Sequence, residues 1–182
     1  LEEKQNNVKE KLYKKIKSKV NILIKKRAIT NNPIIYHLKN LDETYTGNKK
    51  FEFEKFTNVI LFFTQNISKL WKTKLLKLIW YSEFYNFKTN SKSISGIAFS
   101  HWDLGPVPKH FYGLFDLMTE NLNLINIKEY TEFYNGEIIE NLKDFNKDLF
   151  STEELETLQT VLNKFKNYTA SELVDKTHNE KA

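Results

Sequence analysis

The sequence contains no cysteine, only five glycines and three prolines, and a single arginine, Arg27, among its 28 basic residues. Without cysteine, the chain has no disulfide framework, no thiolate zinc site and no cysteine nucleophile. Its longest uncharged apolar run, Val59 to Phe63, is too short to span a bilayer, and its first residues lack the apolar stretch of a signal peptide. These absences predict a soluble, cytoplasmic protein with no membrane partner.

What the chain does contain is typical of a folded protein. Of its 182 residues, 40% are hydrophobic and 14% aromatic, which is enough for a sizeable core in one domain. The net charge of +5 is unevenly spread, because residues 1–50 hold 13 basic and 5 acidic side chains whereas residues 129–182 hold 6 and 12. A basic arm suggests nucleic acid or an acidic partner. With one arginine, however, sequence-specific reading of DNA by this arm is not expected.

The first segment, to about Arg27, is predicted to be a long helix. Its apolar residues are spaced four apart and form a stripe on a lysine-rich helix, which Asn31-Asn32-Pro33 would end; they are Val8, Leu12, Ile16, Val20 and Ile24. The stripe leaves three interpretations open. The helix docks on the domain or on a second copy, it lies on a membrane surface, or it is a tether from an N-terminal module. Because the chain opens without Met, we expect it to be a fragment.

The rest of the chain predicts a small helical domain. Residues 34–54 are assigned to a linker. Helical spacing returns from Phe56 to Ile67, and residues 69–87 are apolar on nearly every face, as expected of a central helix. An alternating strand is predicted up to Trp102, a helix from Pro108, and a hairpin of residues 122–127 and 137–142 turning at Asn135-Gly136.

Two capping boxes predict that a pair of short helices closes the chain. They are Ser151 with Glu154 and Thr169 with Glu172. The fold class is therefore mainly α: a compact helical domain with a small antiparallel sheet or hairpin, preceded by a long N-terminal helix. We divide the chain into a basic arm and linker, 1–50, and a domain, 51–182.

Few residues in this sequence point to catalysis. His101, Asp103 and His110 carry two imidazoles and a carboxylate, which could hold a metal ion that activates water. Their spacing fits no standard zinc pattern, and the competing interpretation is that they bond backbone groups or face solvent. A serine elbow, a phosphate-binding loop and a dinucleotide fingerprint are all missing. The chain is therefore expected not to be an enzyme and to need no metal or cofactor.

Four stretches follow one another in a characteristic order. They are KTKLLKLIWYSEFYNFKTN (72–90), SISG (93–96), LGPVPKHFY (104–112) and ELETLQTVLNKFKNYTASELVDKTHNE (154–180). Together they resemble the Panacea domain of SocA-type antitoxins and related phage-associated proteins. Two positions depart from that pattern: Asn90 or Ser91 stands where the family has glycine, and Thr177 where it has serine.

The resemblance implies a non-enzymatic antitoxin of a toxin–antitoxin system, which neutralises a cognate protein toxin by binding it. Two alternatives come with it: delivery of the toxin to an ATP-dependent protease, and transcriptional autoregulation through a missing N-terminal DNA-binding module. A metal-dependent hydrolase is a further alternative from the histidines, and homodimerisation is left open.

We expect the partner to contact the glycine-proline corner and the lysines of the central helix. The predicted contact residues are Lys72, Lys74, Lys77, His101, Trp102, Asp103, Lys109 and His110. The residues predicted to shape the motif are Gly96, Gly105, Pro106, Pro108 and His178.

Overall fold

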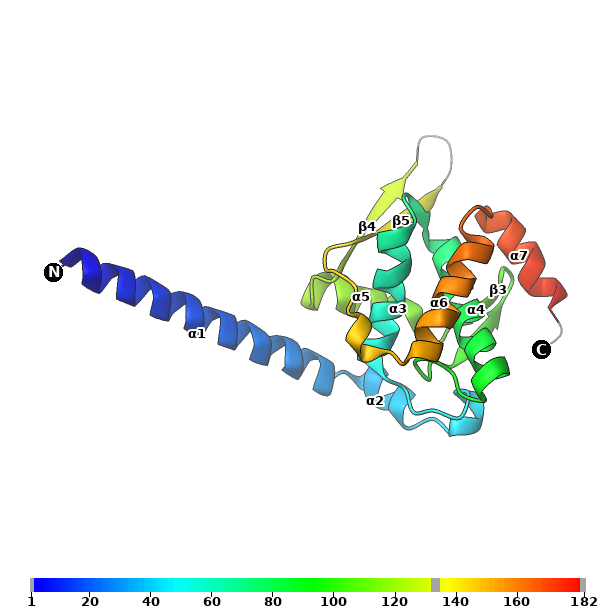
Figure 1. Ribbon diagram of the computed structural model, residues 1–182, viewed down its shortest axis with the longest axis horizontal. Coiled ribbons are helices and arrows are strands. Elements are labelled where there is room, and N and C mark those ends of the chain that lie inside the picture. The colour runs from blue at the N-terminus through cyan, green and yellow to red at the C-terminus, as the bar shows by residue number, and fades with distance from the viewer. Residues whose placement is uncertain (1, 132–134, 181–182) are drawn as a thin grey trace.

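The computed structural model describes residues 2–131 and 135–180, in which one long helix extends from a helical body (Figure 1). This helix, α1 (Glu2–Thr30), ends just before Asn31-Asn32-Pro33, as predicted. Asn32 then caps α2 (Pro33–Lys39), because its side chain accepts hydrogen bonds from the backbone N–H groups of Ile34 and Ile35. The chain therefore turns at the predicted point but forms a new helix at once.

The segment 34–54, assigned to a linker from its sequence, belongs to the body. It contains α2 and a short 3-10 helix, η1 (Glu43–Tyr45), and it places Ile35, Leu38 and Phe51 in the core, each 2% exposed or less. The linker interpretation is wrong because these apolar residues meet helices that come later in the chain. The division of the chain at residue 50 remains a prediction.

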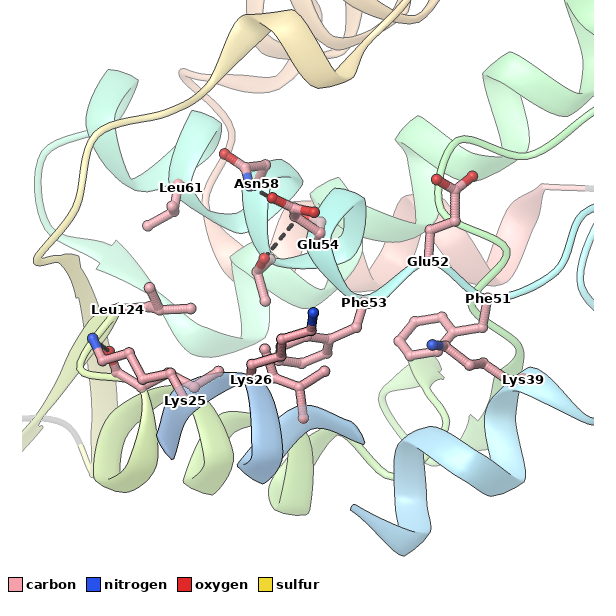
Figure 2. A pocket seen from close by; sticks show the side chains of 13 residues that line it. Lys25, Lys26, Lys39, Phe51, Glu52, Phe53, Glu54, Asn58, Leu61 and Leu124 are labelled. Carbon is pink, nitrogen blue, oxygen red and sulfur yellow. Dashed lines mark hydrogen bonds between the residues drawn. The ribbon is translucent and has the colours of Figure 1, made fainter. Parts of the chain in front are cut away.

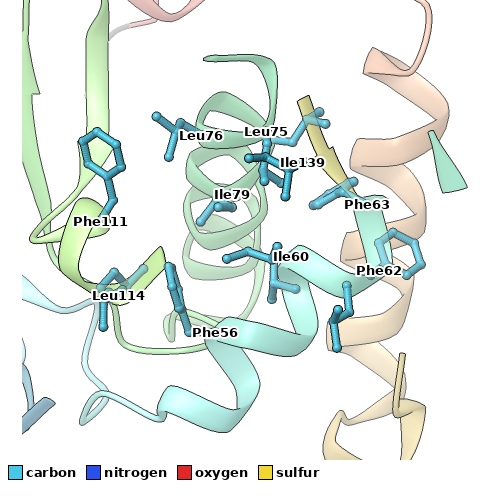
Figure 3. Close-up of a cluster of buried hydrophobic side chains, with 14 of the residues drawn as sticks. Phe56, Ile60, Phe62, Phe63, Leu75, Leu76, Ile79, Phe111, Leu114 and Ile139 are labelled. Carbon is cyan, nitrogen blue, oxygen red and sulfur yellow. The ribbon is translucent and has the colours of Figure 1, made fainter. Parts of the chain in front are cut away.

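The centre of the body is a pair of helices, α3 (Phe53–Asn66) and α4 (Lys72–Asn90), both predicted from their apolar spacing. Figure 3 shows Phe56 and Ile60 of α3 on the side that faces Ile79 of α4. A third helix, α6 (Thr152–Phe165), packs against both. Its Phe165 stacks on Tyr81 of α4 with ring centroids 4.2 Å apart. The apolar spacing within each segment thus favours a helix there, and the apolar faces of these helices form the core where they pack together.

Two small antiparallel sheets complete the body. In the first, the order is β1-β5-β4, formed by β1 (Leu70–Trp71), β5 (Gly136–Asn141) and β4 (Ile125–Tyr130). The predicted β4–β5 hairpin is therefore present. Its predicted turn at Asn135-Gly136 is wrong, because Gly136 already pairs with Tyr130 inside the ladder. The second sheet pairs β2 (Phe99–Trp102) with β3 (Gly105–Pro108).

The helix predicted from Pro108 begins three residues later. Pro108 pairs with Phe99 as the last residue of β3, and α5 (Phe111–Asp116) follows a left-handed residue, His110. Strand pairing outweighs the helix-starting preference of proline here. The π-helical turn η2 (Leu117–Asn121) extends α5 directly.

Both predicted capping boxes are confirmed. Ser151 and Glu154 exchange side-chain-to-backbone hydrogen bonds at the start of α6, which follows the short helix η3 (Lys147–Leu149). Thr169 and Glu172 do the same at the start of α7 (Ala170–Asn179). The fold class is thus as predicted, mainly helical with small antiparallel sheets. Among the residues described, we find no helix with the length and hydrophobicity needed to cross a membrane.

Candidate functional site

The glycine-proline corner consists of the turn of the β2–β3 hairpin and of strand β3, to which Gly105, Pro106 and Pro108 belong. Trp102 pairs with Gly105, so Asp103 and Leu104 form the exposed loop between the strands. Gly105 has φ +86°, a conformation that favours glycine. A Cβ at this position would lie 2.9 Å from Oγ1 of Thr177 in α7, so a larger residue would also collide with that helix. Gly105 is therefore required both by the backbone conformation of the turn and by the close packing of α7.

A buried lysine supports the corner from below. Lys77 of α4 is 1% exposed, and its Nζ donates a 2.9 Å hydrogen bond to the carbonyl oxygen of Pro106. Burial lowers the pKa of Lys77 to about 8. A Cβ on Gly105 would lie 3.3 Å from this Nζ and 3.6 Å from Nε2 of His178. The structure thus brings Lys77 and His178, which are far apart in sequence, to the neighbouring residues Gly105 and Pro106.

Of the three lysines of the central helix that are predicted to contact a partner, two are not accessible. Lys74 and Lys77 are buried, and Nζ of Lys74 donates a 2.6 Å hydrogen bond to the carbonyl oxygen of Lys166. Burial also lowers the pKa of Lys74. Lys72 is half-buried, forms an ion pair with Glu137 and lies over the ring of Tyr112, 5.2 Å from its centroid. Of these three lysines, Lys72 alone keeps part of its side chain exposed.

An exposed apolar surface, which we call the corner patch, consists of Trp102, Leu104 and Tyr112. Their exposed fractions are 47%, 57% and 56%. The rings of Trp102 and Tyr112 lie 6.0 Å apart between centroids, and Trp102 also contacts the buried Phe111 at 5.5 Å. Trp102 was predicted as a contact residue, whereas Leu104 and Tyr112 were not. Both stand at the ends of the LGPVPKHFY stretch, which is the signal that could have found them.

The remaining predicted corner residues surround this patch or lie beneath it. His101 and Asp103 are exposed on the β2–β3 hairpin, and Lys109 is half-buried. His110 is exposed, with φ +59°. Partial loss of water around its ring, together with the nearby charges of His37 and Lys109, lowers its pKa. Pro108 is buried as the last residue of β3.

The histidines of the corner belong to two separate pairs. His101 faces His178 with ring centroids 6.4 Å apart, whereas His110 faces His37 at 5.2 Å. Across residues 2–131 and 135–180, no three His, Cys, Asp or Glu side chains are grouped so that they could hold a metal ion. The convergence of His101, Asp103 and His110 that a metal-dependent hydrolase would need is thus not found in the described chain.

The SISG stretch forms a second supporting element. Glu83 of α4 is 3% exposed and accepts hydrogen bonds from the backbone N–H groups of Ile94, at 2.6 Å, and Ser95, and from the hydroxyl of Ser95. Burial raises the pKa of Glu83. Gly96 has φ +72°, and a Cβ there would lie 2.5 Å from the carbonyl oxygen of Lys50. The stretch therefore joins α4 to the segment before α3.

Two cavities of the body are lined by residues outside the corner patch. One, of about 600 Å³, separates the C-terminal part of α1 from α3 (Figure 2). Phe51, Phe53 and Leu124 supply apolar lining, and Lys25 and Lys26 of α1 also line it. A second, of about 960 Å³, lies beside β1 and the α6–α7 connection. Neither described lining contains a histidine, and neither includes a corner-patch residue.

One family profile, antitoxin SocA-like, Panacea domain, matches residues 75–182. The match includes the corner, Lys77 and the helices α6 and α7. The chain belongs to this family. The Panacea match leaves out α1 to α3 together with Lys72 and Lys74. No curated protein and no solved structure matches the chain.

The match divides the predicted site residues. Lys77, every predicted corner residue, Gly96 and His178 lie within the Panacea domain. Lys77, Gly105, Pro106 and His178 come together in the structure, whereas the exposed corner residues form a surface above them. The domain thus has a supporting layer and an accessible layer at the same corner.

Proposed function

We propose that this protein is an antitoxin that neutralises a cognate protein toxin by direct binding, with the corner patch as the centre of the interface. Membership of the SocA-like antitoxin family supports the general role. The single observation that supports the location is the exposed cluster of Trp102, Leu104 and Tyr112, which lies on the β2–β3 hairpin and the start of α5, next to a strand that Lys77 holds through Pro106. The mechanism is occlusion of a toxin surface by this patch.

The patch has the chemistry of an interface centre. Tryptophan and tyrosine are enriched among residues that dominate binding energy, because they bury a large area at a small cost in side-chain entropy. The Trp102 and Tyr112 rings pack on each other and on Phe111, so part of that entropy is already lost in the free protein. Binding of a partner then costs little further side-chain entropy at these two residues.

The surroundings of the patch fit the polar rim of such an interface. His101, Asp103 and His110 are exposed around it, and Lys72 lies over Tyr112. Charged and polar groups at a rim contribute more to partner choice and association rate than to affinity. The aromatic centre therefore supplies the affinity, and the rim selects the toxin.

The test is neutralisation in cells. The toxin is first recovered by affinity purification of the full chain from its own host and identified as the protein that arrests growth when expressed alone. Co-expression with the wild-type chain should restore growth, whereas the Trp102→Ala, Tyr112→Ala double variant should not. Tyr45→Ala is the matched control, because Tyr45 is 77% exposed and lies outside the patch. Normal neutralisation by the double variant would refute the proposed location.

The same experiment separates occlusion from delivery to a protease. If the protein acts by occlusion, the amount of toxin in the rescued cells stays constant and the purified pair forms a stable complex. A toxin that disappears only when this protein and an ATP-dependent protease are both present would instead identify a protease adaptor.

A further inference from the structure

A second candidate interface lies on α1, outside the Panacea match. Six apolar side chains of this helix fall, at about 100° per residue, within an arc of about 120°. We call this set the α1 stripe: Leu12, Tyr13, Ile16, Val20, Leu23 and Ile24. All six are between 46% and 65% exposed. An uninterrupted apolar stripe of this kind faces a partner in folded proteins.

The body of the protein does not cover the stripe. α1 touches the body near its C-terminus, where Ala28 and Ile29 pack against the core and Nζ of Lys25 donates a 2.7 Å hydrogen bond to the carbonyl oxygen of Leu122. At about 100° per residue Lys25 and Ile29 point roughly opposite to the centre of the stripe, and Ala28 lies about 40° beyond its edge. Figure 1 shows α1 leading away from the body. Docking of the stripe on its own domain, one of the interpretations of the sequence, is therefore wrong.

We propose that the α1 stripe binds an acidic amphipathic helix of a partner protein. Tyr13, Ile16, Val20 and Leu23 are separated by three, four and three residues, which is the a and d spacing of a helix-pairing seam. A seam of this spacing fits between the side chains of a second helix. A lipid surface requires an apolar face but no such spacing.

The charges beside the seam define the partner. In the heptad that places Tyr13 and Val20 at a positions, Lys17 occupies an e position and Lys19 and Lys26 occupy g positions. These positions set partner choice in paired helices, and lysine there is complemented by glutamate or aspartate. The partner helix therefore carries acidic side chains on both sides of its own apolar seam.

Charge also disfavours a second copy of α1 as the partner. Residues 9–30 hold nine lysine and arginine side chains but one acid, Glu10, so the segment carries a net charge of +8. Glu10 already pairs with Lys14 at 2.7 Å. Two such helices lying side by side would repel each other, whereas an acidic helix would be attracted.

Binding of two labelled synthetic peptides to the full chain tests this inference independently of any toxin. One peptide is a helix with leucine and valine at a and d and glutamate at e and g; the other is identical but has lysine at e and g. Fluorescence anisotropy should show binding of the glutamate peptide, weakened by salt, and much weaker binding of the lysine peptide. The Ile16→Asn, Val20→Asn variant should bind the glutamate peptide at least about tenfold more weakly.

The matched control is Ile22→Asn, because Ile22 is 62% exposed on α1 but lies outside the stripe. This variant should bind as the wild type does, and the helicity of all variants is compared by circular dichroism. Equal binding of both peptides would overturn the inference. So would concentration-dependent dimers in sedimentation equilibrium that the stripe variant abolishes, or binding to phosphatidylglycerol vesicles with no binding to either peptide.

Discussion

Nζ of Lys77 donates a 2.9 Å hydrogen bond to the carbonyl oxygen of Pro106, 29 residues further along the chain. The bond joins the central helix to strand β3, which lies between the turn with Leu104 and the helix with Tyr112. It also keeps a lysine inside the core, at 1% exposure, where its charged form is disfavoured. The corner is thus supported by a group whose protonation costs folding free energy.

The Lys77→Met variant should alter the pH dependence of stability. Burial lowers the pKa of Lys77 from 10.5 to about 8, so between these values the unfolded chain binds more protons than the folded one. The contribution of Lys77 to the free energy of unfolding is therefore lowest below pH 8, and it rises by about 3 kcal/mol as the pH increases to 10.5. Urea unfolding across this window should show the wild type gaining that amount relative to the variant. A difference independent of pH would contradict the assignment; Lys88→Met, at an exposed lysine, is the control.

Replacing Gly96 by alanine should be strongly destabilising. The residue has φ +72°, and the new Cβ would meet the carbonyl oxygens of Lys50 and Lys49 at 2.5 and 2.6 Å, both backbone atoms. We expect a loss of about 3 kcal/mol in urea unfolding. Gly136→Ala should cost less, because its Cβ would meet only the ring of Trp71. Equal losses in the two variants would contradict this ranking.

Replacing a residue by glycine, at Ser91, should stabilise the end of α4. Ser91 follows the helix with φ +57° and ψ +18°, and its N–H bonds to the carbonyl oxygen of Phe87. Glycine adopts this left-handed conformation without the steric cost that serine pays. The Ser91→Gly variant should therefore gain about 0.5–1 kcal/mol, which would appear as a higher thermal midpoint. A lower midpoint would show that the Ser91 side chain makes a compensating contribution.

The hydroxyl of Ser95 should stabilise the buried carboxylate of Glu83. Ser95→Ala removes one donor and should cost about 1–3 kcal/mol at neutral pH. Burial raises the pKa of Glu83 above 4.5, and loss of the donor raises it further, so stability falls as the pH rises through this higher value. The loss should therefore shrink at acidic pH, where Glu83 is protonated in both proteins. Unfolding at the two pH values, with Ser100→Ala as a control, checks this; an equal loss at both would contradict it.

The helices were predictable because their signals are local. The Ser151–Glu154 and Thr169–Glu172 boxes each lie within four residues and form as expected. The same holds for the apolar spacing of α3 and α4. Predictions failed where strand pairing competed with local preference, since Pro108 completes a ladder with Phe99 instead of starting a helix.

The site was predictable only in part. The sequence predicts the corner motif and Trp102, but it also predicts Lys74 and Lys77 as contact residues although both are buried. Their acceptors, the carbonyl oxygens of Lys166 and Pro106, lie 92 and 29 residues away. No spacing within α4 distinguishes a lysine that will find a distant carbonyl from one that faces water.

Short-range patterns and the order of motifs were enough to predict the helical class of this protein, its long basic N-terminal helix and its resemblance to the Panacea domain. Which side chains are accessible depended on tertiary packing. Packing of distant segments buried Lys77 and Glu83, incorporated residues 34–54 into the body, and left Trp102, Tyr112 and the α1 stripe exposed. Accessibility depends on contacts between residues far apart in the chain, and local patterns do not encode those contacts.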